Sequence, residues 1–235
     1  MAKKIKNEDR FEQVERVFDK TERYIMENKK SLMIIIGSVV LIVLGYVTYR
    51  FVYLPNKENS AQREFFRSQL YVEDASNKDS VAPANNDYKL ALDGDGQSKG
   101  ILEVADNYSM TKTGNLANYS AGVVYLQLGD YRKAIDYLSD FSSEDIILSS
   151  LAKGCIGDAY FELGEKDNAI NAYNDAIENS SNNFTTPIYL IKLAVLYESN
   201  KNYKEALKIY KRIKKDFKDY KTMEVEQYIV RLANK

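Results

Sequence analysis

Three segments of similar pattern decide the fold: GVVYLQLGDYRKAIDYL at 122–138, GDAYFELGEKDNAINAY at 157–173 and AVLYESNKNYKEALKIY at 194–210. Each begins with a small residue, has a tyrosine three residues later and an alanine in its second half. The aligned alanines Ala134, Ala169 and Ala206 lie 35 and 37 residues apart. A period of about 34 residues is typical of a solenoid built from helix–turn–helix units. The sequence therefore predicts an all-α fold.

The turns inside these segments support the same reading. Gly129 and Gly164 fall where the two helices of a unit would be joined, a place where left-handed backbone favours glycine. The third copy has Lys201 there. Together these features resemble the tetratricopeptide repeat (TPR) family. The resemblance implies an α-solenoid over 113–235, with about three repeats and a capping helix at 221–233.

A second feature is the uncharged apolar run SLMIIIGSVVLIVLGYVTY at 31–49, which residues 51–54 prolong. At ~1.5 Å per helical residue it reaches roughly 30 Å, the thickness of a bilayer's hydrocarbon core. It lacks the alternation of polar and apolar positions of a soluble core helix. The region before it is too long and too mixed in charge for a cleaved signal peptide. We therefore expect a single transmembrane signal-anchor helix at 31–54.

Charge near this run predicts its orientation. Lys and Arg number nine in residues 1–30 and four in the twenty residues after Tyr49. The positive-inside rule then places the tail in the cytoplasm and the rest of the chain on the other side. Within the run, Gly37, Leu41 and Gly45 follow one another at i+4 spacing, which permits close approach of another helix in the membrane.

The segments on either side of the run are expected to be mainly helical. In the cytoplasmic tail, residues 8–28 have an amphipathic helical pattern that fits either the bilayer surface or a partner protein. Between the run and the repeats, at 55–112, we expect a linker followed by leading helices at 57–73 and 98–109. The small polar residues at 74–87 between those helices predict a flexible loop.

The amino-acid composition argues against an enzymatic or metal-binding function. The chain has no His, one Cys and a formal net charge of −1. Without His it lacks the commonest general base and metal ligand. Cys155 lies among small and apolar residues and is expected to be a packed, inert thiol. The DGDG cluster at 93–96 lacks the further ligands of a calcium loop and predicts a tight turn. We expect no enzyme, cofactor or metal site, and no basic stripe for nucleic acid.

By analogy with TPR proteins, the first helix of each unit contributes to a concave binding surface. The residues expected on this surface are Tyr119, Val123, Leu126, Asp158, Phe161, Ile188, Ile191 and Val195. Some TPR domains bind the C-terminal carboxylate of a partner through Lys and Asn at fixed positions of these helices. The corresponding positions here hold other residues, so binding of a C-terminal carboxylate is not expected. An apolar groove suits an extended or helical apolar segment. The alternative is that these side chains pack against neighbouring helices.

The order of tail, span and repeats resembles the YfgM-type ancillary subunits of the bacterial Sec translocon, including the stretch GNLANYSAGVVYLQLGDYRKAI at 114–135. The resemblance implies a single-pass protein of the bacterial inner membrane, with a cytoplasmic N-terminus and a periplasmic TPR domain. It implies as partners the lipid bilayer, a SecYEG-type translocon, a PpiD-type membrane-anchored periplasmic chaperone and nascent exported polypeptides. The role would be a non-enzymatic scaffold or co-chaperone of export.

Two other readings remain open. One is a TPR adaptor in envelope or outer-membrane assembly or secretion, without translocon contact. The other is a eukaryotic organelle-anchored TPR receptor. Finally, Asp79-Ser80-Val81 resembles the O-glycosylation site of exported Bacteroidota proteins, which makes Ser80 a candidate for modification.

Overall fold

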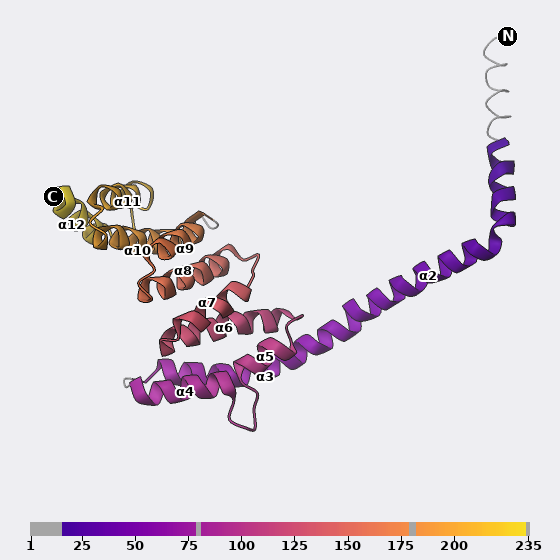
Figure 1. The fold of residues 1–235 in the computed structure, drawn as a ribbon, viewed down its shortest axis with the longest axis horizontal. Coiled ribbons are helices and arrows are strands. Elements are labelled where there is room, and N and C mark those ends of the chain that lie inside the picture. Colours follow the sequence, from indigo (N-terminus) through magenta and orange to yellow (C-terminus); the bar gives the residue numbers. More distant parts are fainter. Residues whose placement is uncertain (1–15, 79–80, 179–181, 234–235) are drawn as a thin grey trace, which may run out of the picture. The chain divides into compact units, whose positions relative to one another are not determined.

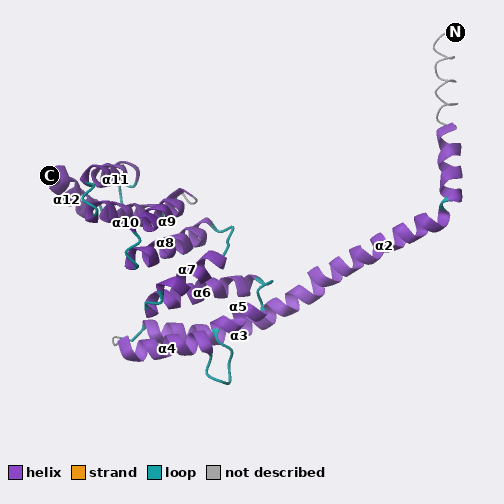
Figure 2. Cartoon of the chain, in the orientation of Figure 1, coloured by secondary structure: helices purple, strands orange, loops and turns teal. Residues whose placement is uncertain are grey.

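The structure, a computed structural model, describes residues 16–78, 81–178 and 182–233. Within these residues the chain is helical almost throughout, and the only β contact is an isolated bridge between Gly94 and Lys99 (Figure 2). The all-α prediction is confirmed. The chain divides into two compact units, Met1–Asn56 and Lys57–Lys235, which are described in turn.

The described part of the first unit, residues 16–56, is almost entirely helical. Residues 16–27 are helical, and the earlier part of the predicted tail helix lies outside the described residues. After it come α2 (Lys29–Thr48), the π-helical turn η1 (Tyr49–Tyr53) and the start of α3 (Leu54–Ser76). These three elements form one uninterrupted helix of 48 residues (Figure 1). Within the described residues it is the one helix long and apolar enough to cross a membrane, in agreement with the length and composition of the predicted span.

In its described residues the second unit contains the rest of α3 and nine further helices, and successive helices of these nine pack against one another (Figure 1). They are α4 (Val81–Asp93), α5 (Ile101–Asn107), α6 (Lys112–Leu128), α7 (Tyr131–Asp140), α8 (Ile146–Glu162), α9 (Lys166–Glu178), α10 (Thr186–Ser199), α11 (Tyr203–Asp216) and α12 (Thr222–Ala233). The pairs α6–α7, α8–α9 and α10–α11 coincide with the three repeats of the sequence.

The loop expected at 74–87 is wrong for most of its length. α3 continues to Ser76 and α4 begins at Val81. The small residues that indicated a loop are in part buried in helices: Ala75 of α3 and Ala84 of α4 are both buried. Small side chains occur in loops and also in helices that pack closely together. The sequence alone does not distinguish these two cases, whereas the tertiary contacts do.

The repeat pattern itself is confirmed in detail. The aligned alanines of the three copies are fully buried. Gly129 and Gly164 have φ angles of 79° and 75°, the left-handed conformation that ends a helix. Lys201, which replaces glycine in the third copy, has a φ of 60°. The third turn therefore keeps the geometry of the other two without the residue that adopts it most easily.

Glu58 attaches the leading helix α3 to the first repeat. Its carboxylate accepts hydrogen bonds from the backbone N–H of Lys112 at 2.8 Å and the hydroxyl of Thr113 at 2.5 Å, in the first turn of α6. A carboxylate here also lies at the positive end of the helix dipole. Burial raises the pKa of Glu58, but hydrogen bonds from Thr113, Gln62 and Lys112 outweigh it, and the net pKa is lowered.

Candidate functional site

A pocket of about 300 Å³ opens beside the first helices of the three repeats. It is lined by Leu126 of α6, Tyr131 of α7, Asp158, Phe161 and Glu162 of α8, and Lys192 of α10. Three of the residues expected on the concave surface, Leu126, Asp158 and Phe161, therefore meet in one hollow. Half of the lining is apolar or aromatic, and the other half consists of three charged side chains, Asp158, Glu162 and Lys192.

Asp158 is the centre of a polar network that joins three helices. The ammonium of Lys192 lies 2.6 Å from both carboxylate oxygens of Asp158. The hydroxyl of Tyr173, on α9, donates to Oδ1 of Asp158 at 2.7 Å. Lys192 also lies 5.8 Å from the ring centre of Tyr189. Because its oxygens already accept from these donors, Asp158 fixes the pocket wall instead of serving as a free base.

Two glycines of α8 make room for the aromatic rings behind this network. A Cβ added at Gly154 would lie 1.9 Å from the ring of Tyr189, and one at Gly157 would lie 2.5 Å from the ring of Tyr173. The two rings stack with their centres 6.2 Å apart. Burial raises the pKa of both tyrosines well above its usual value, and the charge of Asp158 adds to this at Tyr173. Both phenols are thus neutral hydrogen-bond donors.

Cys155 and Tyr119 lie close to the same network and are packed. Burial raises the pKa of the Cys155 thiol to about 11, and the charge of Asp158 adds to the rise. The thiol is therefore protonated at neutral pH, as expected for an inert cysteine. The ring of Tyr119 lies 5.3 Å from that of Phe141, and burial raises the pKa of Tyr119 to about 12.

The remaining predicted residues divide into packed and exposed ones. Val123 is half-buried, and Ile188 and Ile191 pack against the C-terminal hydrophobic cluster. Phe161 and Val195 are 40% and 44% exposed. The packing alternative thus describes Ile188 and Ile191, whereas Phe161 and Val195 leave apolar surface exposed to solvent.

Three pocket residues, Tyr131, Glu162 and Lys192, were not expected from the sequence. Lys192 aligns with Cys155 of the preceding repeat, a position that the repeat pattern leaves undefined. A signal was present, because Asp158 and Lys192 carry opposite charge and lie 34 residues apart, about one repeat. Neighbouring repeats place such residues on adjacent helices.

The face of α2 that carries Gly37, Leu41 and Gly45 is open. Leu41 is exposed, and a Cβ added at either glycine would meet nothing within 4 Å. This leaves space for close approach of another helix. Ser80, the candidate for O-glycosylation, lies outside the described residues.

The DGDG cluster forms the predicted tight turn. Oδ1 of Asp95 accepts from the backbone N–H groups of Gln97 and Ser98, at 2.9 and 2.6 Å. The hydroxyl of Tyr71 donates to Oδ2 at 2.8 Å. These hydrogen bonds, that of Ser98 foremost, lower the pKa of Asp95. Within the described ranges no group of three or more His, Cys, Asp or Glu side chains is placed to hold a metal ion.

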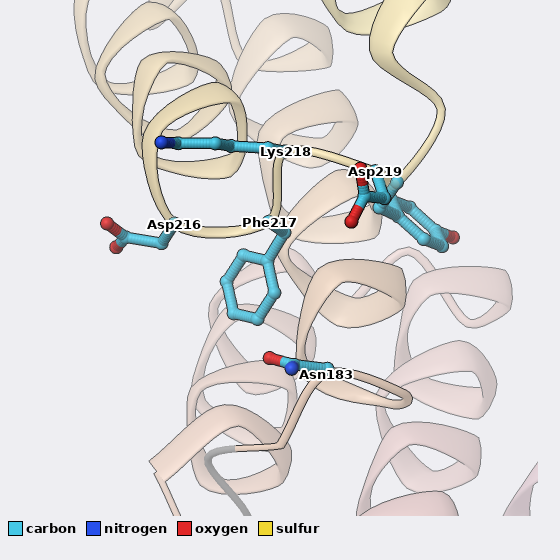
Figure 3. Close-up of a pocket in the computed structure, with 6 residues that line it drawn as sticks. Asn183, Asp216, Phe217, Lys218 and Asp219 are labelled. Atoms are coloured by element: carbon cyan, nitrogen blue, oxygen red, sulfur yellow. The ribbon is translucent and has the colours of Figure 1, made fainter.

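A second hollow of about 240 Å³ lies between the segment before α10 and the turn after α11 (Figure 3). The ring of Phe217 points toward Asn183, whereas the side chain of Lys218 extends away from both. Phe217 packs against the C-terminal hydrophobic cluster, and Asp216 lies 3.7 Å from Arg212. Phe217 thus belongs partly to the core, and Asp216 already has a partner on α11.

Comparison with known proteins supports the repeat assignment. Residues 117–140 and 156–220 match family models described as tetratricopeptide repeat. A crystal structure of the MamA protein is similar at a TM-score of 0.45 and 20% identity, over 71% of this chain and 81% of MamA. A second MamA crystal structure gives 0.42 and 20%, over 66% and 87%. No protein of curated function matches the sequence.

The second unit therefore contains tetratricopeptide repeats at 117–140 and 156–220, within an α-solenoid. TPR domains bind other proteins, so this unit is a protein–protein interaction scaffold. Proteins with this fold are typically scaffolds without catalytic activity.

Proposed function

We propose that this chain is a membrane-anchored TPR scaffold of the bacterial Sec translocon, which receives exported polypeptides and passes them to a membrane-anchored periplasmic chaperone. The observation that carries the proposal is the joining of two parts in one chain. An apolar helix of spanning length continues into α3, which is hydrogen-bonded to the first TPR helix through Glu58.

The proposed topology is supported by charge. The nine basic residues of 1–30, against four in the twenty residues after Tyr49, favour a cytoplasmic tail and a periplasmic TPR unit by the positive-inside rule. The open face of α2 at Gly37, Leu41 and Gly45 suits a helix of the translocon or of the chaperone.

The client would bind at the pocket as an extended or helical apolar segment. Leu126 and Phe161 supply apolar contact, and the exposed side chain of Val195 continues it on α10. Lys192 and Asp158 satisfy one another, so they do not require a charged partner. Such a surface favours apolar segments with little sequence specificity, which is what a receiver of many unfolded chains needs.

A photo-crosslinking experiment in native membranes tests the proposal. A crosslinker at Phe161 or Val195 is expected to capture translocon, chaperone or nascent-chain components. The matched control is Asn171, an exposed residue of α9 that does not line the pocket. The proposal fails if the pocket positions capture none of these partners, or if Asn171 captures them equally well.

The same crosslinking experiment, repeated with a substitution in the membrane helix, distinguishes a translocon subunit from a TPR adaptor that acts elsewhere in the envelope. A translocon subunit should lose its partners when Leu41 is replaced by lysine, because a charge at the helix centre opposes insertion by about 3 kcal/mol. An adaptor that acts away from the translocon should retain them. A protease-protection assay that finds the TPR unit on the cytoplasmic side would contradict the proposed topology.

A further inference from the structure

The outer face of α11 carries a row of lysines that the pocket does not use. Four of them recur along the helix at i, i+4, i+7 and i+11, the spacing of one helix face. Two more lie in the turns before and after the helix. The lysine row comprises six exposed side chains: Lys201, Lys204, Lys208, Lys211, Lys215 and Lys218.

The row points to solvent because the opposite face of α11 forms part of the core. Ala206, Tyr210 and Ile213 are fully buried on that face. From Lys204 to Lys215 the helix rises about 16 Å, so the four helical lysines form a straight line. No large apolar side chain of α11 is exposed beside them.

Most of this charge is uncompensated. Lys208 lies 3.5 Å from Glu205, and the other five have no ion pair with any residue that the structure describes. Residues 201–221 hold nine basic and three acidic residues, a net +6, whereas residues 57–178 hold 11 basic and 21 acidic ones, a net −10. The chain total of −1 thus conceals two segments of opposite sign.

We propose that the lysine row binds the anionic headgroups of a phospholipid bilayer; this rests on the proposed membrane anchor, which keeps the TPR unit close to such a surface. Lysines near an anionic membrane each add to its attraction for the protein. A straight row of ammonium groups fits a flat surface. The acidic repeats are repelled by the same surface, so the two charges together favour one orientation of the TPR unit.

Other anionic partners fit less well. Lysine is depleted from the cores of protein interfaces, where aromatic side chains and arginine anchor the partner. α11 presents no exposed aromatic ring on this face, whereas a single-stranded nucleic acid is held by stacking on such rings. Duplex DNA is read mainly through arginine and amide side chains, and the row contains only lysine.

The test uses the full chain inserted in vesicles of phosphatidylcholine, with or without phosphatidylglycerol. A donor dye on Asn202→Cys reports energy transfer to an acceptor on the lipid headgroups. Asn202 is exposed and makes no side-chain capping hydrogen bond to α11. Cys155 competes little for the dye, because it is half-buried and its pKa is raised to about 11, which lowers its thiolate fraction about a hundredfold below that of an exposed thiol.

Two variants with the same loss of charge are compared. The row variant combines Lys204→Gln, Lys211→Gln and Lys215→Gln. The control variant combines Lys89→Gln, Lys112→Gln and Lys166→Gln, three exposed lysines outside α11 that also have no ion pair with a described residue. At about fivefold per lysine, the row variant should lower the ratio of docked to undocked domains about a hundredfold.

We expect transfer to be higher with phosphatidylglycerol than without it. It should fall in high salt and in the row variant, and it should persist in the control variant. Equal transfer in both lipids, or an equal loss in both variants, overturns the proposal. So does salt-dependent self-association in detergent that the row variant abolishes, since this assigns the row to a second copy of the chain.

The anchor is tested separately in the same preparation. Wild-type chain that alkaline carbonate extracts from pure phosphatidylcholine vesicles contradicts the membrane anchor and with it the proposed function. Chain that resists extraction but shows no lipid-dependent transfer contradicts only the lysine row.

Discussion

Gly154→Ala should destabilise the TPR unit, although alanine is the better helix former. Gly154 lies inside α8, where this exchange ordinarily stabilises a helix by about 1 kcal/mol. Here the new Cβ would lie 1.9 Å from two ring carbons of Tyr189. Carbon atoms in contact lie about 3.5 Å apart or more, so the ring or a helix must move by about 1.6 Å.

The surroundings leave little room for that movement. Tyr189 is 3% exposed, and the ring of Tyr173 stacks against it at 6.2 Å. Overpacking a core costs about 1–3 kcal/mol, and a rigid buried ring belongs at the upper end of that range. After subtraction of the gain in helix propensity, we expect a net loss of about 2 kcal/mol. For a domain of this size that lowers the thermal midpoint by about 4–8 °C.

The assay is thermal and urea unfolding of the full chain in detergent, followed by circular dichroism of the helices. The control is the same substitution in a Tyr189→Leu background, where the ring that obstructs the Cβ is absent. There Gly154→Ala should be neutral or stabilising. The reasoning is refuted if Gly154→Ala raises the midpoint of the wild-type chain, or if the loss is the same in both backgrounds.

Three further predictions concern single positions. Glu58→Ala should lower the free energy of unfolding by about 1 kcal/mol at neutral pH, the usual value of a helix cap. The folded-state pKa of Glu58 is lowered from 4.5, so its stabilising contribution is present above pH 4.5 and is lost as pH falls through the lower folded-state pKa. The thermal midpoint, measured as pH is lowered, should therefore change less in the variant than in the wild-type chain. Lys201→Gly should raise the thermal midpoint, since a non-glycine residue at a φ of 60° costs about 1 kcal/mol; a lower midpoint would contradict this. Alkylation of Cys155 should be about a hundredfold slower in the folded chain than in urea, because its pKa rises from 9.0 to about 11, and equal rates would contradict its burial.

The parts of the fold that the sequence predicts well are those set by a repeating pattern. The alanines and turn glycines recur because each repeat makes the same helix contacts and the same turn. A position that recurs in several copies is therefore a stronger signal than one that occurs once. The same regularity identifies Lys201 as a left-handed position without glycine. The segment 74–87 has no such repetition. Its alanines fit a loop or a closely packed helix equally well, and contacts with α5 and α6 decide between them.

The candidate site is predictable only in part, for a related reason. Periodicity places Ile191 and Phe161 on comparable helices, but it does not determine how much of each side chain a neighbour covers. The ion pair of Asp158 with Lys192 depends on the offset between adjacent repeats, which no single repeat encodes. The lysine row was not predicted for another reason: the net charge of the chain does not show where along the sequence the charges lie.

The proposed function places a limit on how strongly the pocket can bind. A fully buried apolar side chain contributes about 1.5–3 kcal/mol, and a millimolar dissociation constant already requires about 4 kcal/mol. A hollow of about 300 Å³ that receives one such side chain therefore holds a client weakly by itself. The network around Asp158 joins α8, α9 and α10, so little ordering is needed on binding, but it adds no new contact.

The pocket can therefore be occupied to a useful extent only if the local concentration of client is high. A bilayer anchor confines the pocket to the surface where chains emerge, and tethering raises an effective concentration without any new contact. The lysine row, by fixing the orientation of the TPR unit, would act in the same way. Weak binding then becomes an advantage, because a client that dissociates quickly is passed on. On this reasoning, loss of the anchor should reduce client capture more than loss of Phe161, although Phe161 is proposed to touch the client and the anchor is not.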